Sequence, residues 1–387
     1  MLRFLTAGES HGPQLTAILD GMAAGVAVSS EEIDRDLARR QAGYGAGPRM
    51  KIEHDHARIT GGVLGGRTTG APLALTIDNL DHEKWKDRDI APLTVPRPGH
   101  ADLTGAIKYG YRELRLALER ASARETAARV AVGAICRKFL GEFGIVIGSY
   151  VVAIGSVEAR LADEASYLDR FAQADQSDVR CPDPIAAETM HAEIRAAMDA
   201  KDTLGGITEV VALNVPPGLG SYVQWDRRLS ARLIGALSSV PAMKGVEIGP
   251  AFENTRRRGT QVHDEILRDG SRLVRATNRS GGFEGGITTG EPIVMRAAMK
   301  PIATTLNPLR SVDLATGAET RTDYERSDFC PVPRAGVILE AMTAFVLADA
   351  LIEKLGGDSL AEMKPRFEQL RQARLEDLLM DNGEWRF

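Results

Sequence analysis

A twelve-residue pattern that occurs twice constrains the fold of this chain more than any other feature. Residues 61–72 read GGVLGGRTTGAP and residues 281–292 read GGFEGGITTGEP, so both fit G-G-x-x-G-G-x-T-T-G-x-P. A weaker similarity pairs residues 15–25 with residues 208–218, in the same order along the chain. Internal repeats of this kind indicate related structural units. Gly-rich turns that arose independently are the simpler explanation, but they fit a match over consecutive positions less well.

The repeat predicts an α+β fold in which two pseudo-symmetric β–α–β units share one core. We expect repeat halves near 1–200 and 201–354, within a single domain that spans all 387 residues. A strongly apolar helix is expected over 336–354, and an amphipathic helical tail over 355–387. A chain of this length can bury a substantial core.

The segment at 97–128 is the most informative for function. The pair at 98–99, Pro-Gly, predicts a turn that would place His100 at the edge of a loop. A helix is expected over about 102–119. Ser122-Ala-Arg-Glu125 matches a capping box, which predicts the start of a second helix.

Positive charge is concentrated in this same segment. Arginine donates two parallel hydrogen bonds, which suits planar oxyanions, so the cluster indicates a small and multiply anionic substrate. Two ordinary surface helices with solvated arginines would give the same pattern. The cluster consists of Arg97, Arg112, Arg115, Arg120 and Arg124.

Further polar residues lie in loops bounded by Gly or Pro, which is where binding and catalytic groups concentrate. They are Ser10, His11, Arg40, Arg49, Lys300, Arg326 and Asp328. His11 and His100 are the strongest candidates for general acids, since imidazole titrates near neutral pH. The set suits phosphate or carboxylate chemistry without a metal. His54-Asp55-His56 could suggest a metal site, but a polar strand edge is favoured because no further ligand cluster follows.

Net charge and cysteine content narrow the class of protein. The net charge of −5 gives no reason to expect a nucleic-acid or membrane surface. Three widely spaced cysteines show neither a disulfide framework nor metal-ligand spacing, which favours a reducing cytosol. The N-terminal residues do not resemble a signal peptide, and no apolar run reaches the roughly 18 residues of a membrane span. We therefore expect a cytoplasmic protein.

These motifs together resemble the chorismate synthase family over nearly the whole chain. The resemblance rests on GESHG at 8–12, RMKIEHD at 49–55, RPGHAD at 97–102, ASARETAARVAVGA at 121–134, GGFEGG at 281–286, KPIAT at 300–304 and RSDFCPVPRA at 326–335.

The resemblance implies a β–α–β sandwich, with helices packed between antiparallel sheets, that assembles as a homotetramer. It also implies the 1,4-anti elimination of phosphate from 5-enolpyruvylshikimate 3-phosphate to give chorismate, the last common step toward aromatic amino acids. Reduced FMN is required although there is no net redox change. NADPH is a possible reductant, and an external flavin reductase is a possible partner.

Individual roles follow from the resemblance. His11 is implied as the acid that protonates the departing phosphate, His100 as the residue that manages the flavin proton, and Asp328 as the base, with Ser10 and Ser122 beside them. The implied substrate ligands are Arg40, Arg49, Arg97, Arg124 and Arg326. The implied flavin contacts are Arg120, Ala121, Ser122, Ala123, Pro241, Ala242, Gly285, Lys300, Pro301, Ile302, Ala303, Thr304 and Arg326.

The chain departs from the family pattern at Ala46, Pro48, Ala121, Pro241 and Ser327. Two other functions are compatible with parts of the pattern. A flavin reductase or flavin-storage protein would use a flavin site but would not need so many arginines or two histidines. A non-catalytic anion-binding oligomer would use the arginines while the acids stay inert.

Overall fold

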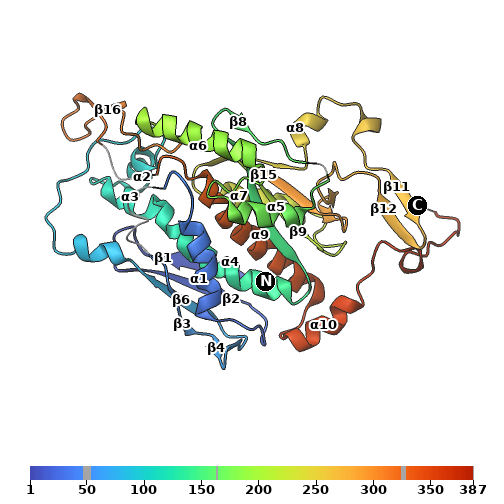
Figure 1. Cartoon of the computed structure of the whole chain (residues 1–387). Helices are drawn as coiled ribbons and strands as arrows, with labels where there is room; N and C mark the ends of the chain where they lie inside the picture. Colours follow the sequence, from blue (N-terminus) through green and yellow to red (C-terminus); the bar gives the residue numbers. More distant parts are fainter. Residues whose placement is uncertain (47–53, 163, 324–327, 387) are drawn as a thin grey trace.

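Two antiparallel sheets enclose a layer of helices in the computed structural model, which describes residues 1–46, 54–162, 164–323 and 328–386 (Figure 1). The first sheet has the strand order β1–β2–β6–β3, with bounds Arg3–Ala7, Gln14–Asp20, Leu73–Asp78 and Ala57–Gly61. The second has the order β10–β15–β9–β7–β8, with bounds Met243–Ile248, Ile293–Met299, Gly206–Leu213, Val146–Ile154 and Val157–Glu158. The predicted α+β sandwich is confirmed.

Four helices form the middle layer: α1 (Ser30–Gln41), α4 (Thr126–Gly141), α7 (Leu229–Ser238) and α9 (Val332–Leu355). Helix α4 packs on β2 and β6 of the first sheet, and α9 packs on β7 and β9 of the second. The two central helices approach so closely that a Cβ at Gly133 would lie 2.2 Å from the Cβ of Ala341. Only glycine fits at position 133, because the interface between α4 and α9 is close-packed.

Helix α9 is long and apolar enough to cross a membrane, which the sequence analysis did not anticipate. In the folded protein, 89% of the most apolar 18-residue stretch of α9 is buried. Its apolar character is therefore explained by its place at the centre of the core, where it is covered by α4, α7 and the second sheet (Figure 1).

The two units have the same order of elements. The first contains β1, β2, α1, β3, β6 and α4, and the second contains β7, β9, α7, β10, β15 and α9. Corresponding strands occupy corresponding places in the two sheets. The single domain and its halves near 1–200 and 201–354 stay a prediction. Because β7 corresponds to β1, we propose that the second unit begins at Val146.

The repeated Gly-Thr pattern forms the same hairpin in both units. Thr68 Oγ1 donates to the carbonyl of Ala23 at 2.6 Å, and Thr288 Oγ1 donates to the carbonyl of Pro216 at 2.7 Å. The equivalent glycines have similar positive φ values, for example 73° at Gly66 and 84° at Gly286. The pattern thus specifies one turn structure twice. The hairpins are β4–β5 (Val63–Leu64, Arg67–Thr68) and β13–β14 (Phe283–Glu284, Ile287–Thr288).

The helix expected over 102–119 is wrong as a single element. It forms α2 (Asp102–Tyr109) and α3 (Arg115–Ala121), because Gly110 adopts a left-handed conformation with φ 68°. The capping box is also wrong. Ser122 Oγ accepts from the backbone N–H of Arg124, whereas the Glu125 carboxylate accepts from Thr6 and Arg129.

The remaining elements lie around this core. They are the α-helices α5 (Tyr167–Gln176), α6 (Pro184–Asp199), α8 (Ala251–Asn254) and α10 (Leu360–Glu368), the strands β11 (Ile266–Asp269), β12 (Arg272–Arg275), β16 (Arg310–Val312) and β17 (Glu319–Arg321), and the 3₁₀ helices η2 (Leu80–Lys84), η3 (Ala123–Glu125), η4 (Trp225–Arg227), η5 (Gly259–Gln261) and η6 (Leu375–Asp377).

Candidate active site

A cleft of about 540 Å³ lies where corresponding ends of the two units meet. The C-terminal ends of α1 and α7 contribute Arg40 and the loop with Pro241. The N-terminal ends of α4 and α9 contribute Arg124 and Arg334. Because a helix N-terminus carries partial positive charge, two central helices that begin at the cleft favour an anion there.

His11 lies between a carboxylate and an indole. Its Nδ1 is 2.7 Å from Glu119 Oε1, and its backbone N–H donates to Glu119 Oε2 at 2.8 Å. The ring of Trp85 packs on the imidazole with 4.2 Å between the ring centroids. Partial burial alone would raise the pKa of Glu119, but hydrogen bonds from His11 outweigh it and lower that pKa. Glu119 is thus an anion at neutral pH, and Nε2 of His11 is left to exchange a proton.

His100 is held in a similar way. Its Nδ1 lies 2.5 Å from Oδ1 of Asp102, which is fully buried. Arg97 Nε donates to the same carboxylate at 2.8 Å, and Arg97 Nη1 donates to Thr304 at 3.2 Å. Burial of Asp102 is outweighed by hydrogen bonds from His100 and Arg97, so its pKa lies far below the usual range. Arg97 therefore both lines the cleft and stabilises the His100 pair.

Arg40 and Arg124 converge on one buried carboxylate. Asp55 Oδ2 is 3.3 Å from Arg40 Nη1, and Asp55 Oδ1 is 2.5 Å from Arg124 Nη1. Arg40 also donates to Thr126 Oγ1 at 3.0 Å. With two guanidinium groups on one carboxylate, the cluster carries an excess positive charge. Asp55 lies two residues before the start of β3, so the His54-Asp55-His56 segment leads into a strand.

Asn79 joins this cluster to the loop that carries His11. Its Oδ1 accepts from Arg124 Nε at 2.7 Å, while its Nδ2 donates to the carbonyls of Glu9 at 3.1 Å and Gly12 at 2.7 Å. The side chain is nearly buried, with 4% of its surface exposed. The arginine cluster and the histidine loop are therefore parts of one hydrogen-bonded unit.

Ser10 and Ser122 meet in the cleft. Ser122 Oγ donates to Ser10 Oγ at 3.0 Å, and the residues before and after Ser122, Ala121 and Ala123, also line the cleft. This part of the lining lies at the junction of α3 and η3 and consists of small side chains.

The opposite wall is largely apolar and ends in a cation. Lys300 Nζ donates to the carbonyl of Gly99 at 2.6 Å, and burial together with the charge of Lys244 lowers the pKa of Lys300. An apolar wall beside an ammonium group and hydroxyls suits a planar ring that carries a phosphate, so these residues fit a flavin. The wall consists of Pro241, Ala242, Met299, Ile302 and Ala303, with Thr304 at its edge.

Asp328 lines the cleft and forms an ion pair with Arg334 of α9. Burial and the nearby Arg40 guanidinium lower the pKa of Arg334. Contact with the Asp328 carboxylate offsets the free-energy cost of burying the charged Arg334 guanidinium, since a buried charge requires a partner.

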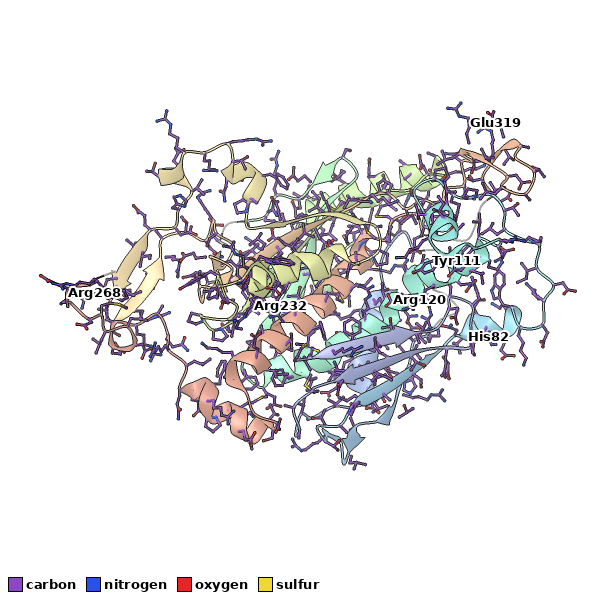
Figure 2. The ribbon with its side chains drawn as sticks, turned by 180° about the vertical axis from the view of Figure 1, so that it is seen from behind. His82, Tyr111, Arg120, Arg232, Arg268 and Glu319 are labelled. Carbon is purple, nitrogen blue, oxygen red and sulfur yellow. The ribbon has the colours of Figure 1, made fainter. Side chains whose placement is uncertain are left out.

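Some predicted residues lie elsewhere. Arg120 donates to the carbonyls of Thr6 at 3.0 Å and Gly8 at 3.3 Å; in Figure 2 it lies in the same half of the molecule as His82 and Tyr111, far from Arg268. Gly285 is at an exposed hairpin tip. Neither of these lines the cleft of the described chain, and neither does Pro301. Arg49, Arg326, Pro48 and Ser327 lie outside the described residues.

The sequence analysis missed six residues that hold the site together: Asp55 as an arginine partner, Asn79, Trp85, Asp102, Glu119 and Arg334. Asp102 lies only two positions after His100, so the sequence alone could have indicated that the two side chains interact. The others reach the site by tertiary contact, such as the 108 positions that separate His11 from Glu119. In the ranges that the structure describes, no group of three or more His, Cys, Asp or Glu side chains could hold a metal ion.

Comparison with known proteins gives a consistent result. The family model for chorismate synthase matches residues 2–352. The chorismate synthase of Aquifex aeolicus (strain VF5) is 55% identical over 384 residues, covering 95% of this chain and 96% of that protein. The enzyme of Rubrobacter xylanophilus is 53% identical over 373 residues, with 94% and 95% covered. A crystal structure of chorismate synthase superposes with a TM-score of 0.79 at 48% identity, covering 95% of this chain and 96% of that one. The chain belongs to the chorismate synthase family.

Proposed function

We propose that the cleft eliminates phosphate from 5-enolpyruvylshikimate 3-phosphate in a 1,4-anti reaction that gives chorismate, with reduced FMN as cofactor. Family membership itself implies a small-molecule substrate and a flavin requirement. The observation that carries the proposal is that two histidine–carboxylate pairs and two buried arginines face one cleft.

Substrate binding is assigned to the arginine cluster. Asp55 orients Arg40 and Arg124, so little side-chain entropy is lost when they bind a planar oxyanion. The positive ends of α4 and α9 add to their attraction for the phosphate and carboxylates of the substrate. Arg97, Arg49 and Arg326 are proposed as further ligands on the resemblance alone.

Proton transfer is assigned to three side chains. His11 holds a proton at Nε2 and gives it to the departing phosphate, while Glu119 holds Nδ1. His100, fixed by Asp102, holds a proton beside the apolar wall. Asp328 accepts the proton that leaves the substrate carbon, and Arg334 stabilises its carboxylate before the transfer.

The apolar wall and Lys300 would hold the flavin, together with Ala121, Ser122 and Ala123 at the junction of α3 and η3. When bound in reduced form, FMN supplies an electron reversibly, which accounts for a cofactor requirement without net redox change. Arg120, Gly285 and Pro301 are proposed as flavin contacts on the resemblance alone.

We further propose a cytoplasmic homotetramer, by resemblance to the family. The electrons for the flavin come either from NADPH bound by this protein or from an external flavin reductase. Turnover under anaerobic conditions with NADPH and no other reductant distinguishes the two, because only the first route sustains it.

Neither alternative function is favoured. A flavin reductase has no use for paired arginines on a buried carboxylate, and a passive anion-binding oligomer has no use for two oriented imidazoles. The family match over residues 2–352 supports the same choice.

The test is anaerobic turnover of 5-enolpyruvylshikimate 3-phosphate with chemically reduced FMN. We expect stoichiometric chorismate and inorganic phosphate, no consumption of reduced flavin, and no product with oxidised FMN. Reduced flavin consumed in proportion to product would overturn the proposal, and so would the absence of phosphate release.

A further inference from the structure

The loop that carries His11 is bound to the C-terminal part of α3 at three points. The backbone N–H of Ser10 donates to the carbonyl of Glu119 at 3.1 Å. The backbone N–H and the ring Nδ1 of His11 contact the two separate oxygens of the Glu119 carboxylate, at 2.8 and 2.7 Å. We propose that Glu119 is a positioning residue that acts through His11, which rests on the function proposed above.

The chemistry of the contact specifies a carboxylate. Both oxygens of Glu119 accept a hydrogen bond from the same residue, and an ionised carboxylate has acceptors on both oxygens. The oxygen of a glutamine can accept from the backbone N–H of His11, but its nitrogen then faces Nδ1 as a donor. It can bond Nδ1 only when that atom carries no proton, so it cannot accept from an Nδ1–H as the carboxylate does. An aspartate keeps the charge but is shorter by one methylene, so it cannot reach both groups from the same backbone position.

Further side chains lie around the His11–Glu119 pair. Trp85, which directly follows η2, covers the ring, and His82 of η2 contacts the His11 carbonyl at 2.8 Å. Arg115 of α3 acts on Glu119 by its charge. Glu119 is the carboxylate that directly contacts the His11 ring in the described part of the chain.

Because of these contacts, the orientation of the His11 ring is set by its neighbours, and His11 itself only has to deliver the proton. Glu119 fixes the tautomer and the ring orientation, and Trp85 shields the face of the ring from water. Nε2 is then presented in one direction only. Proton delivery to a leaving phosphate depends on such alignment, because small displacements of a catalytic group reduce the rate steeply.

The test uses the full-length enzyme with FMN and compares Glu119→Gln, Glu119→Asp and the control Glu83→Gln. Glu83 lies on η2 near the cleft, and its side chain is 74% exposed in a surface pair with Lys86. We expect Glu119→Gln to lower kcat by about 10- to 10²-fold, no more than the loss of the general acid itself. KM should change by less than about threefold, since the arginine cluster is intact. Glu83→Gln should match the wild type.

The division of the effect between kcat and KM separates a positioning role from a merely structural one, because a general loss of structure would change both. In Glu119→Asp, which keeps the charge but loses the geometry, we expect a lower kcat and a KM close to that of the wild type. In a His11→Ala background, Glu119→Gln should have no further effect, because the two residues act as a unit.

Two results would overturn the inference: a Glu119→Gln variant with wild-type kcat, or full additivity of the Glu119→Gln and His11→Ala effects on kcat. A wild-type enzyme that releases no phosphate would instead reject the proposed function. The two failures are therefore distinguishable.

Discussion

Asp55 Oδ1 lies 2.5 Å from Arg124 Nη1, and both side chains are almost completely shielded from solvent. This pair connects the loop before β3 with the N-terminal end of α4. Arg40 of α1 binds the second oxygen of the same carboxylate at 3.3 Å. The geometry of the anion site thus depends on a residue that we do not expect to touch the substrate.

Asp55→Asn should weaken substrate binding and lower stability together. The amide leaves two buried guanidinium groups without their counter-charge, and breaking a buried ion pair costs about 3–5 kcal/mol. We expect a lower Tm and a KM at least about tenfold higher, the factor that 1.4 kcal/mol represents. Thermal unfolding and steady-state kinetics measure the two effects.

The matched control is Asp78→Asn. Asp78 pairs with Arg58 at 2.7 Å, but both side chains are more than half exposed, so this pair should contribute no more than about 1 kcal/mol. A KM of Asp55→Asn equal to that of Asp78→Asn would show that the orientation of Arg40 and Arg124 does not govern binding.

His11→Ala and His100→Ala should each reduce turnover by about 10²-fold or more, as expected when a general acid is removed. Both residues lie in loops rather than in the apolar core, so the variants should fold. Anaerobic turnover with reduced FMN, together with circular dichroism, tests this. Turnover within a few-fold of wild type and normal substrate affinity would refute the assigned roles.

The sequence specified the scaffold of the site better than its interactions. The twelve-residue repeat predicted two equivalent units, because the Gly and Thr positions encode a turn through local backbone geometry. The Gly- and Pro-bounded loops likewise indicated where His11, His100 and Lys300 would lie. Local rules were sufficient for these features.

The partners of those residues could not be predicted in the same way. Glu119 is an ordinary helical glutamate in the sequence, and only the packing of α3 against the loop after β1 brings it to His11. Asn79 likewise follows a strand and reads as a turn residue. The expected helix over 102–119 is wrong for a local reason, since Gly110 adopts the left-handed conformation that terminates α2.

Glu340 gives a prediction for the dependence of stability on pH. It is completely buried in α9; burial alone would raise its pKa, but Arg39 and Arg137, followed by Arg180, outweigh it and lower the pKa to about 2 from 4.5. A carboxyl group with a depressed folded-state pKa adds stability above its unfolded pKa and loses that contribution as the pH falls. We expect the Tm to decline between about pH 4.5 and 2 for this reason.

Glu340→Gln should remove this contribution. At pH 7 the variant should be less stable by about 3 kcal/mol, because Arg39, Arg137 and Arg180 lose their shared buried carboxylate. Asp36 and Asp175 remain as their more exposed partners. Its Tm should then fall less steeply than the wild-type Tm on acidification below pH 4.5. Calorimetry across this range measures both. Parallel Tm curves for the two proteins would mean that Glu340 is not the group responsible.

Asn79 allows the coupling between the arginine cluster and the histidine loop to be tested from a single position. Asn79→Asp keeps an oxygen for Arg124 but replaces the donor nitrogen, so the carbonyls of Glu9 and Gly12 lose their hydrogen bonds and face a negative oxygen. We expect a reduced kcat, because the His11 loop is displaced, and a nearly unchanged KM. Asn79→Ala removes both sets of bonds and should raise KM as well as lower kcat.

The control is Asn214→Asp, which removes a comparable donation at 3.0 Å to the carbonyl of Gly144, away from the cleft. Asp tolerates the positive φ of 60° at this position, so the backbone should not be strained. Steady-state kinetics under anaerobic reduced-flavin conditions compare the three variants. Removing a bond to a charged group such as Arg124 typically costs about 1.5–3 kcal/mol, so the KM of Asn79→Ala should exceed that of Asn79→Asp by about tenfold or more. Equal KM values for the two Asn79 variants would show that Asn79 does not hold Arg124 in its binding geometry, and that the loop and the cluster act independently.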